Sequence, residues 1–268
     1  MEIGKKVKIE KIRASTGSEI LQDLIPAELF LKIVLNNNVI SVISCSPQNL
    51  VELTIGYLIN NGYIENYSDV NIINFCQDSL IKKKSGTVLN TQVDVNCKKI
   101  NLEDLKYSKF ISSACGSTDE FILQKRLSRI KSDIKVKSEV ILKLNLETVN
   151  RQKYKKELGG LHSAALFDKD GKILNLMEDI GRHNCIDKIT GYMLINKIEF
   201  SDKIIFTTGR LSMDVVYKIC RMSVPIIVTN SSITYSAVKQ AKKMNLTAIG
   251  YARSGRFNIY SNPDRIVK

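Results

Sequence analysis

The feature that most constrains this fold is an alternation of helical and extended patterns from residue 147 to the C-terminus. Apolar runs bounded by turn residues alternate with amphipathic stretches and predict the order α-β-β-α-β-α-β-α-β. Strands separated by helices imply largely parallel pairing, with helices on both faces of the sheet. Right-handed crossovers then bring the strand-to-helix loops 179–184, 207–210 and 230–233 to one edge. We therefore expect a ligand pocket at that edge.

The expected elements of this region, residues 147–268, follow from turn and cap signals. Gly159 and Gly160 end the first helix, and a hairpin turn at residues 168–171 joins the first two strands. The expected helices cover residues 147–158, 183–196, 211–222 and 234–244. The expected strands cover residues 161–167, 172–177, 203–206, 225–228, 247–251 and 257–260. Together they predict an α/β domain.

Residues 1–107 are predicted to form a separate, smaller α+β unit. The asparagine run at 36–38 favours a hairpin turn between two strands. Ser46 suits the cap of a helix, Pro47 suits its first position, and Gly62 suits its end. The expected strands of this unit cover residues 6–13, 27–35, 39–45, 70–76 and 87–97.

The six cysteines are scattered along the chain, which is typical of a protein in a reducing compartment. None is paired at Cys-x-x-Cys spacing, so a zinc ribbon and a thioredoxin-type motif are excluded. Cys115 lies in a loop of the connecting segment 108–146, just ahead of a helix expected at 121–130. A helix N-terminus lowers a thiol pKa from its free value of about 8.5, and Gly116 keeps the sulfur accessible. Cys115 is therefore the candidate nucleophile, with an unreactive loop thiol as the alternative. Buried packing is expected for Cys45, Cys76, Cys97 and Cys220.

The net charge of +13 indicates an anionic partner. The lysines are spread along the chain, and no stretch interleaves aromatic residues with arginines as a single-strand nucleic-acid binder would. A phosphorylated or nucleotide-like small ligand explains the charge at least as well, and we expect no nucleic-acid partner. No apolar run approaches the roughly 20 residues of a membrane span, and the N-terminus lacks the apolar core of a signal peptide. We therefore expect a cytoplasmic protein without a membrane partner.

The predicted strand order is that of the cytidine deaminase-like fold, so zinc-dependent deamination must be considered. A zinc deaminase needs His-x-Glu at the second helix and Pro-Cys-x-x-Cys at the start of the next. Here no Glu stands two residues after His183, and the loop at 207–210 contains no cysteine. Three zinc ligands cannot be assembled at these places, so neither deamination nor a metal site is expected.

A serine nucleophile elbow, a P-loop and a Gly-x-Gly-x-x-Gly loop are also absent. Four arginines instead lie at predicted strand ends or in the loops after them: Arg182, Arg210, Arg253 and Arg256. The planar fork of arginine suits pyrophosphate groups and guanine edges. A single arginine is more often an ordinary surface residue, but the shared placement of these four favours an anion-binding pocket.

Several distinctive blocks run in order along nearly the whole chain. They are residues 46–58, the loop Ala114-Cys115-Gly116, residues 159–164, Glu178-Asp179-Ile180-Gly181-Arg182-His183-Asn184 with Asp187-Lys188, Thr208-Gly209-Arg210, and residues 250–256. In these blocks the chain resembles the formate dehydrogenase accessory sulfurtransferases, the FdhD family. The Glu-Asp-x-Gly-Arg-His-Asn block is the most specific of them.

The resemblance implies a cytoplasmic sulfur carrier with a cytidine deaminase-like three-layer α/β/α domain. Such proteins take sulfane sulfur from a cysteine desulfurase and pass it to the molybdenum cofactor, a bis(molybdopterin guanine dinucleotide). That cofactor is bound as a ligand, not held permanently, and is then inserted into formate dehydrogenase. By position, Cys115 corresponds to the persulfide-carrying cysteine of the family, whose members typically form homodimers.

By the resemblance, the stretch Tyr251, Ala252, Arg253, Ser254, Gly255 and Arg256 corresponds to the family's cofactor-binding stretch. The predicted pocket at the sheet edge adds Arg182, His183, Asn184, Gly209 and Arg210 as candidate binding residues for a guanine-nucleotide-type ligand. His183 and His162 are candidates for orienting phosphates or for proton transfer, with an ordinary strand histidine as the alternative for His162. Glu178 and Asp179 are expected to orient the turn and its arginine, not to act as an acid/base pair.

One departure from the family pattern concerns the cysteine loop. The family commonly carries Cys-x-x-Cys there, whereas the second position in this chain is Thr118. A lone thiolate can still accept a sulfur as a persulfide, because that step needs one nucleophile only. The alternative function is a molybdenum-cofactor-binding chaperone without sulfur transfer.

Overall fold

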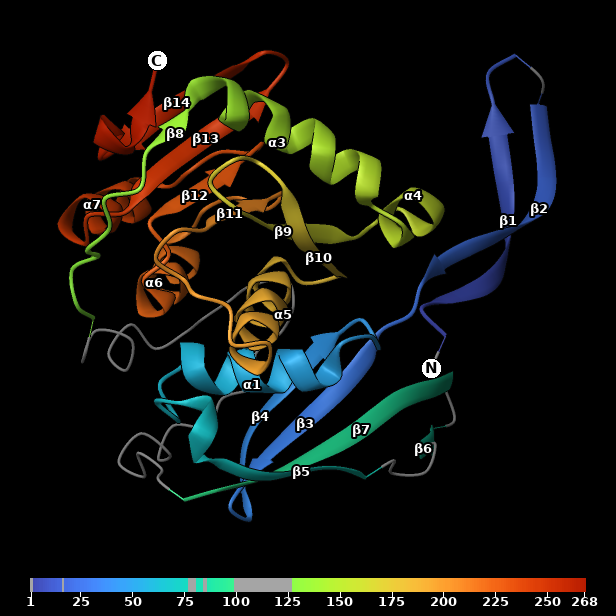
Figure 1. Ribbon diagram of the computed structural model, residues 1–268. Coiled ribbons are helices and arrows are strands. Elements are labelled where there is room, and N and C mark those ends of the chain that lie inside the picture. Colours follow the sequence, from blue (N-terminus) through green and yellow to red (C-terminus); the bar gives the residue numbers. More distant parts are fainter. Residues whose placement is uncertain (1, 16, 77–80, 84–85, 99–126) are drawn as a thin grey trace.

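The computed structural model describes residues 2–15, 17–76, 81–83, 86–98 and 127–268 (Figure 1). Its largest element is a six-stranded mixed sheet in the order β10-β9-β11-β12-β13-β14. The strands are β9 (His162–Phe167), β10 (Ile173–Asp179), β11 (Ile204–Thr207), β12 (Ile226–Thr229), β13 (Thr247–Arg253) and β14 (Arg256–Ser261). The pairs β11–β12 and β12–β13 are parallel, whereas β9, β10 and β14 join in antiparallel fashion. The expectation of largely parallel pairing was therefore wrong for β9, which pairs antiparallel with β11 although a helix separates them.

Helices cover both faces of this sheet (Figure 1). One face packs against α3 (Ser138–Arg151), and the other packs against α5 (Arg182–Ile195), α6 (Met213–Met222) and α7 (Tyr235–Lys243). Successive strand residues point to opposite faces, so Ile204 and Phe206 contact the α3 side while Ile205 contacts the α5–α7 side. The predicted three-layer α/β arrangement is confirmed, and the finer deaminase-like description stays a prediction.

The N-terminal half forms a second sheet in the order β4-β3-β7-β5. Its strands are β3 (Leu29–Leu35), β4 (Asn38–Cys45), β5 (Val70–Cys76) and β7 (Gly86–Cys97), and β6 (Ile81–Lys83) pairs with β7. Helix α1 (Leu50–Asn60) packs its apolar residues on this sheet. The predicted asparagine turn is confirmed, because Asn36 and Asn37 both have positive φ angles, as a tight hairpin requires.

The two halves meet where α1 packs against α5 (Figure 1). A Cβ atom at Gly56 of α1 would lie 1.8 Å from the carbonyl oxygen of Asp187. A Cβ atom at Gly191 of α5 would lie 2.0 Å from the carbonyl oxygen of Glu52. Glycine at both positions therefore lets the two helix backbones touch, which fixes the N-terminal sheet relative to the C-terminal one.

A long hairpin of β1 (Gly4–Arg13) and β2 (Gly17–Pro26) projects from the body beside this junction (Figure 1). The remaining described elements are α4 (Tyr154–Leu158), β8 (Val136–Lys137), β15 (Ile266–Val267) and two short 3₁₀ turns, Tyr67–Asp69 and Pro263–Arg265. Within the part of the chain that the structure describes, no helix is long and apolar enough to cross a membrane.

Three local expectations were wrong for physical reasons. The helix expected at 147–158 begins at Ser138 and breaks at Gln152, because the Glu178 carboxylate accepts backbone N–H groups and starts a new helix there. Ser46 does not cap α1, whose first turn follows Asn49. The partner strand of β1 was missed because residues 17–26 lack a clear apolar alternation.

The expected helix at 121–130 falls mainly outside the described residues, and residues 127–130 are not helical. The other predicted elements of the C-terminal half are confirmed to within about two residues at each end, as is usual for element boundaries. The division of the chain at residues 107 and 146 stays a prediction.

Candidate functional site

The strand register brings the predicted site loops to one end of the six-stranded sheet, here called the site end. His162 lies opposite Asp179, and Thr207 lies opposite both Ala164 and Thr229. At the edge of the same end, Arg253 pairs with Arg256. The loops 179–184, 207–210, 230–233 and 251–256 therefore follow or join strand ends on one side of the sheet. The expectation that these loops share an edge is confirmed.

Asp179 fixes the first of these loops. Its carboxylate accepts hydrogen bonds from the backbone N–H of Ser46 (3.1 Å), the backbone N–H of Gly181 (2.8 Å) and the Asn184 side-chain amide (2.8 Å). It also forms an ion pair with the Lys188 ammonium at 2.6 Å, and both side chains are fully buried. The Ser46 hydroxyl in turn accepts the N–H of Ile180 at 3.1 Å. Asp179 is thus the centre that ties the loop to both α5 and the N-terminal unit.

Glu178 has an equally defined structural role. Its carboxylate accepts the backbone N–H groups of Lys153, Tyr154 and Lys155 at 2.8 to 3.0 Å, at the start of α4. These N–H groups have no partners within their helix, so the buried carboxylate satisfies them. Asp179 therefore orients the turn as expected, whereas Glu178 orients the backbone at the start of α4 instead. No contact of either carboxylate with Arg182 is found among the described residues.

Two threonines shape the neighbouring loops in the same way. The Thr207 hydroxyl accepts the N–H of Gly209 at 3.1 Å, and the Thr229 hydroxyl accepts the N–H of Ser231 at 3.0 Å. Thr229 also donates to the carbonyl of Gly209 at 2.7 Å. A Cβ atom at Gly209 would lie 2.8 Å from the Cβ of Arg182. Glycine at this position therefore lets the Arg182 side chain cross the loop closely.

The arginines at the site end are left without anionic partners among the described residues. The Nε of Arg182 is buried and has no hydrogen-bond partner there. Arg210, Arg253 and Arg256 are exposed. A buried guanidinium nitrogen without a partner is costly, so a bound anion would stabilise it. The structure thus brings Arg182 and Gly209 together and sets the other three arginines around the same end of the sheet.

The two histidines approach each other at this end and are both uncharged at neutral pH. Burial lowers the pKa of His183 from 6.5 to about 3, and the positive charges of Lys218 and Arg182 add to the shift. Burial also lowers the pKa of His162, with Lys155 and Arg182 adding to it. The His183 Nε2 lies 3.4 Å from the Ser212 hydroxyl. Neutral imidazoles can accept or donate hydrogen bonds but supply no positive charge to a phosphate.

Asn184 is turned toward the protein. Its side-chain amide donates to the carbonyl of Ser44 and to Asp179, both at 2.8 Å. These two bonds occupy both amide hydrogens. The described contacts of Asn184 therefore support the loop and the N-terminal unit.

Residues 251–256 form the hairpin between β13 and β14. Ser254 and Gly255 both have positive φ angles, as in a two-residue hairpin turn, and Tyr251 has a φ of 53°. The Tyr251 N–H donates to the carbonyl of Ser231 at 2.9 Å, which links this hairpin to the neighbouring loop. Ala252 is buried in the core on the α3 side. A bulky residue in the left-handed region is an uncommon conformation that is often found at functional sites.

Four of the six cysteines are buried in the part of the chain that the structure describes. Cys115, Gly116 and Thr118 lie outside the described residues, as does the side chain of Cys76. The thiols that are described and free are all buried: Cys45, Cys97, Cys185 and Cys220. Burial raises the pKa of Cys97 to about 11 and that of Cys220 to about 12, and it raises the pKa values of Cys45 and Cys185 further. These four thiols are therefore protonated at neutral pH and poor nucleophiles.

Two buried cations were not anticipated from the sequence. Lys188 pairs with Asp179, and Lys218 pairs with Asp187 at 2.5 Å. Asn60 of α1 also donates to Asp187, at 2.7 Å. The available signal was a pair of lysines on the apolar faces of two helices, which is unusual because buried lysines need a partner. Among the described residues, no group of three His, Cys, Asp or Glu side chains could hold a metal ion.

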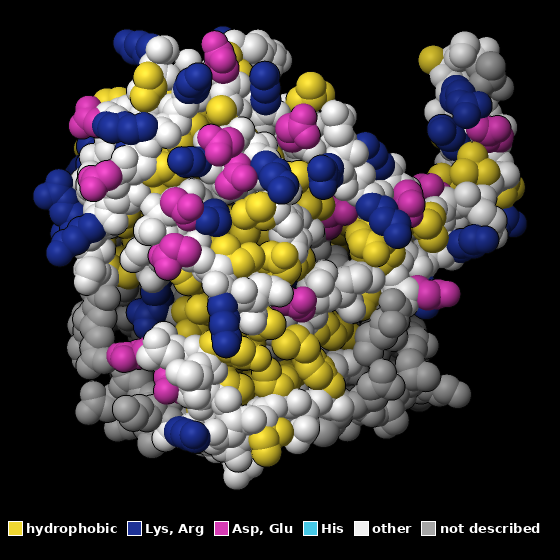
Figure 2. All heavy atoms as spheres, viewed as in Figure 1, with side chains coloured by type: hydrophobic (Ala, Val, Ile, Leu, Met, Phe, Trp, Pro, Cys, Tyr) yellow, Lys and Arg dark blue, Asp and Glu magenta, His cyan; other side chains and the backbone are white. Residues whose placement is uncertain are grey.

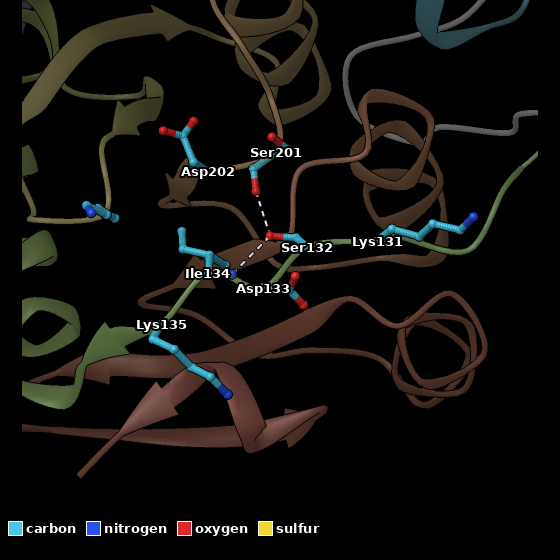
Figure 3. Close-up of a pocket in the computed structure, with 8 residues that line it drawn as sticks. Lys131, Ser132, Asp133, Ile134, Lys135, Ser201 and Asp202 are labelled. Atoms are coloured by element: carbon cyan, nitrogen blue, oxygen red, sulfur yellow. Dashed lines mark hydrogen bonds between the residues drawn. The ribbon is translucent and has the colours of Figure 1, made fainter.

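An open pocket of about 510 Å³ lies at the opposite, far end of the sheet (Figure 3). It is lined by Lys131, Ser132, Asp133, Ile134, Lys135, Lys169, Ser201 and Asp202. The Ser132 hydroxyl donates to the carbonyl of Ser201 at 2.6 Å. The charged residues that line the pocket are exposed to solvent. None of the residues predicted to bind a ligand lines this pocket.

Comparisons with known proteins identify the family and the fold. A sequence model of the FdhD/NarQ family matches residues 26–267. The chain is 32% identical over 250 residues to the sulfur carrier protein FdhD of Bacillus subtilis, covering 92% of this chain and 91% of that protein. It is 31% identical over 265 residues to the sulfur carrier protein FdhD of Sulfolobus acidocaldarius, covering 98% of each. A crystal structure described as a formate dehydrogenase accessory protein from Desulfotalea psychrophila has the same fold, with a TM-score of 0.78, 24% identity and coverage of 99% and 100%.

Proposed function

The chain belongs to the FdhD/NarQ family, and we propose that it is a sulfur carrier that delivers sulfur to the molybdenum cofactor. In this proposal a cysteine desulfurase supplies the sulfur and Cys115 carries it as a persulfide. The cofactor, a bis(molybdopterin guanine dinucleotide), receives the sulfur and is then inserted into formate dehydrogenase in the cytoplasm.

The chemical step requires one reactive thiolate. The Cys115 thiolate attacks the outer sulfur of the desulfurase persulfide, and the sulfur–sulfur bond of that persulfide breaks. The desulfurase cysteine leaves as a thiolate, and a new sulfur–sulfur bond forms at Cys115. No external oxidant or reductant is needed, because one persulfide is exchanged for another. The protein is in this sense a sulfurtransferase.

The observation that carries the proposal is the state of the other thiols. Four of the six cysteines are buried with raised pKa values, which makes them unsuited to accept sulfur from another protein. Cys115 keeps the sequence setting of a reactive thiol, in a loop of small residues before a predicted helix. Names of relatives in two distant organisms, both sulfur carrier proteins, support the same role.

In the proposal, the site end of the sheet binds the guanine dinucleotide ends of the cofactor. Arg182, whose buried Nε has no partner among residues 2–98 and 127–268 as far as these are described, supplies positive charge for the pyrophosphate groups. The exposed Arg210, Arg253 and Arg256 add to it. The neutral His183 adds a hydrogen-bonding group beside them. The cofactor binds as a transient ligand, so the protein needs no permanent cofactor.

The test is to incubate the purified protein with a cysteine desulfurase and cysteine and then measure its intact mass. We expect the wild type to gain the mass of one sulfur atom that a thiol reductant removes. Cys115→Ala should gain none, and the control Cys220→Ala should load like the wild type because its thiol is buried. No adduct on the wild type, or equal loading of Cys115→Ala, would contradict the proposal.

Thr118, at the position of the second loop cysteine of the family, favours a second candidate function. This candidate is a cofactor-binding chaperone that has lost sulfur transfer. It predicts that Cys115→Ala restores formate dehydrogenase activity in cells lacking the protein, whereas Arg182→Ala does not. The sulfur carrier requires both residues for that activity.

A further inference from the structure

The turn that begins α4 is tied to two neighbouring strands of the site end. The Gln152 side-chain amide donates to the buried Ser163 hydroxyl of β9 at 3.0 Å. The N–H of Ser163 donates in turn to the hydroxyl of Thr208, in a site loop, at 3.0 Å. On β10, the Glu178 carboxylate accepts the N–H of Lys155 at 2.8 Å. Because these bonds join α4 to both strands and to a site loop, Lys155 occupies a defined place beside the predicted ligand pocket.

The three lysines of this turn differ in what their ammonium groups contact. The Lys153 ammonium lies over the Tyr154 ring, 5.2 Å from its centroid. The Lys156 ammonium donates to the carbonyl of Asn150 at 2.9 Å. Lys155 is half-buried, and within the described part of the chain its ammonium forms no hydrogen bond or ion pair. Of the three, Lys155 is therefore the cation that a ligand can engage without breaking another contact.

The surface around this turn is strongly basic. Four of the six residues 151–156 are Lys or Arg, and none is acidic. Figure 2 shows Lys and Arg side chains over α4 and the adjoining end of α3 on the face in view. A local excess of one charge raises the concentration of oppositely charged ligands nearby and speeds their arrival. This part of the molecule therefore favours an anion.

His162 lies close to two positive charges of the site end. It is the first residue of β9 and lies opposite Asp179 of β10. Burial lowers the pKa of His162, the positive charges of Lys155 and Arg182 lower it further, and the negative charge of Asp179 opposes them. The Lys155 ammonium and the Arg182 guanidinium therefore both act on the same imidazole, although they belong to different helices.

The nearby acid does not neutralise these two cations. The Asp179 carboxylate is paired with the Lys188 ammonium at 2.6 Å and also accepts the N–H of Gly181. Lys155 and Arg182 form no ion pair with any described carboxylate. Two cations without an acidic partner beside an uncharged imidazole suit a phosphate group, which accepts several charge-assisted hydrogen bonds at once.

We propose that Lys155 and Arg182 together bind one phosphate group of the anionic ligand, with His162 as a hydrogen-bonding group beside them. The proposal rests on the proposed function, because it adds a binding residue, Lys155, to the same site. Arginine supplies a planar fork for two phosphate oxygens, whereas lysine supplies a compact point charge. The ligand is a nucleotide or another compound with a terminal phosphate or diphosphate.

Calorimetric titration of the full chain with GDP and with inorganic pyrophosphate tests the role of Lys155. We expect Lys155→Gln to raise the dissociation constants of both probes by about tenfold. The matched control is Lys156→Gln, which loses the same charge one residue away from an ammonium that already has a partner, and it should bind both probes like the wild type. Circular dichroism confirms that each variant is folded.

Proton NMR of the imidazole rings supplies a second readout that a merely structural role of Lys155 would not move. The chain has only two histidines, so one His→Gln variant assigns both signals. In the free protein, Lys155→Gln should raise the pKa of His162, because a nearby positive charge is removed. Pyrophosphate should raise the pKa of His162 in the wild type, and by less in Lys155→Gln.

Two results would overturn the proposal. One is a GDP affinity of Lys155→Gln equal to that of Lys156→Gln. The other is a wild-type His162 whose pKa does not change when pyrophosphate is added. If Arg182→Ala weakens GDP binding and Lys155→Gln does not, the proposed ligand site stands and the role of Lys155 fails. Sulfur loading of Cys115 is measured separately, so its failure leaves this result unaffected.

Discussion

The two ends of the six-stranded sheet differ in whether their charged side chains are buried and paired or exposed to solvent. At the site end, Asp179 and Lys188 are fully buried and paired, while the buried Nε of Arg182 has no hydrogen-bond partner in the part of the chain that the structure describes. At the far end, the open pocket of about 510 Å³ is lined by charges such as Lys169 and Asp202, which stand largely in solvent. The site end thus holds its buried carboxylate and ammonium in fixed positions and leaves the Arg182 guanidinium free to bind an anion. At the far end, the charged side chains are not held in place by such contacts.

The difference favours the site end over the open cavity as the place for the proposed anionic ligand. Binding a small anion with high affinity requires donors that are held in place before the ligand arrives. The hydrogen bonds of Asp179, Thr207 and Thr229 supply that rigidity at the site end. At the far end, exposed lysines would have to be ordered by the ligand, which costs side-chain entropy.

The largest expected effect is on stability at the site end. Asp179→Ala leaves the Lys188 ammonium buried without its partner, and we expect the free energy of unfolding to fall by about 3–5 kcal/mol. Urea denaturation measures the change. Asp202→Ala, which removes the half-exposed partner of Lys203 at the far end, should cost less than about 1 kcal/mol. Equal losses for the two variants would remove the distinction between the ends.

The next effect is on ligand affinity. Arg182→Ala removes a guanidinium whose hydrogen bonds to a phosphate contribute about 1.5–3 kcal/mol, so the dissociation constant for GDP should rise by roughly ten- to a hundredfold. Calorimetric titration measures it. Lys169→Ala at the far end is the control and should bind GDP like the wild type. If Lys169→Ala lost affinity and Arg182→Ala did not, GDP would bind at the far end of the sheet, which would contradict the proposed site.

A third effect concerns pH. The pKa of His183 is lowered from 6.5 to about 3, so the folded protein binds fewer protons than the unfolded chain between these values. Stability contributed by this group is therefore complete above pH 6.5 and is lost as the pH falls toward 3. Between pH 6.5 and pH 5 the wild type should lose about 2 kcal/mol through His183 alone.

His183→Gln is the variant that isolates this contribution, because it cannot take up a proton. Urea denaturation at several pH values should show a shallower acid-side loss of stability for His183→Gln than for the wild type. Parallel curves for the two proteins would mean that His183 is charged, or titrates normally, in the folded state. His162, whose pKa is also lowered, keeps a residual slope in both proteins.

The smallest expected effect comes from Gly209→Ala. The new methyl group would lie 2.8 Å from the Cβ of Arg182, so the arginine or the loop must shift. We expect a stability loss of about 1 kcal/mol and a GDP affinity between those of the wild type and Arg182→Ala. Denaturation and calorimetry measure the two changes. An unaltered affinity would show that the position of the Arg182 stem does not matter for binding.

Much of this site could be predicted because its signals are local. Alternating apolar runs and turn residues placed β9 to β14, and the strand-end rule placed the loops 179–184, 207–210 and 230–233 together. The buried contacts of Asp179 and Glu178 with distant parts of the chain could not be predicted from local patterns. Ser46 meets Asp179 across 133 residues of sequence, and no periodicity records such a contact. The break after α3 was missed for the same reason, since the carboxylate that starts α4 belongs to Glu178, on a later strand.

The most direct test of where the ligand binds is hydrogen–deuterium exchange of the protein with and without GDP. We expect GDP to slow exchange in peptides that contain residues 179–184, 207–210 and 251–256. Peptides that contain residues 131–135 and 201–202, which line the pocket at the far end, should exchange at the same rate with and without the nucleotide. Protection of the far end, with the site-end loops unchanged, would contradict the assignment of the ligand to Arg182 and its neighbours.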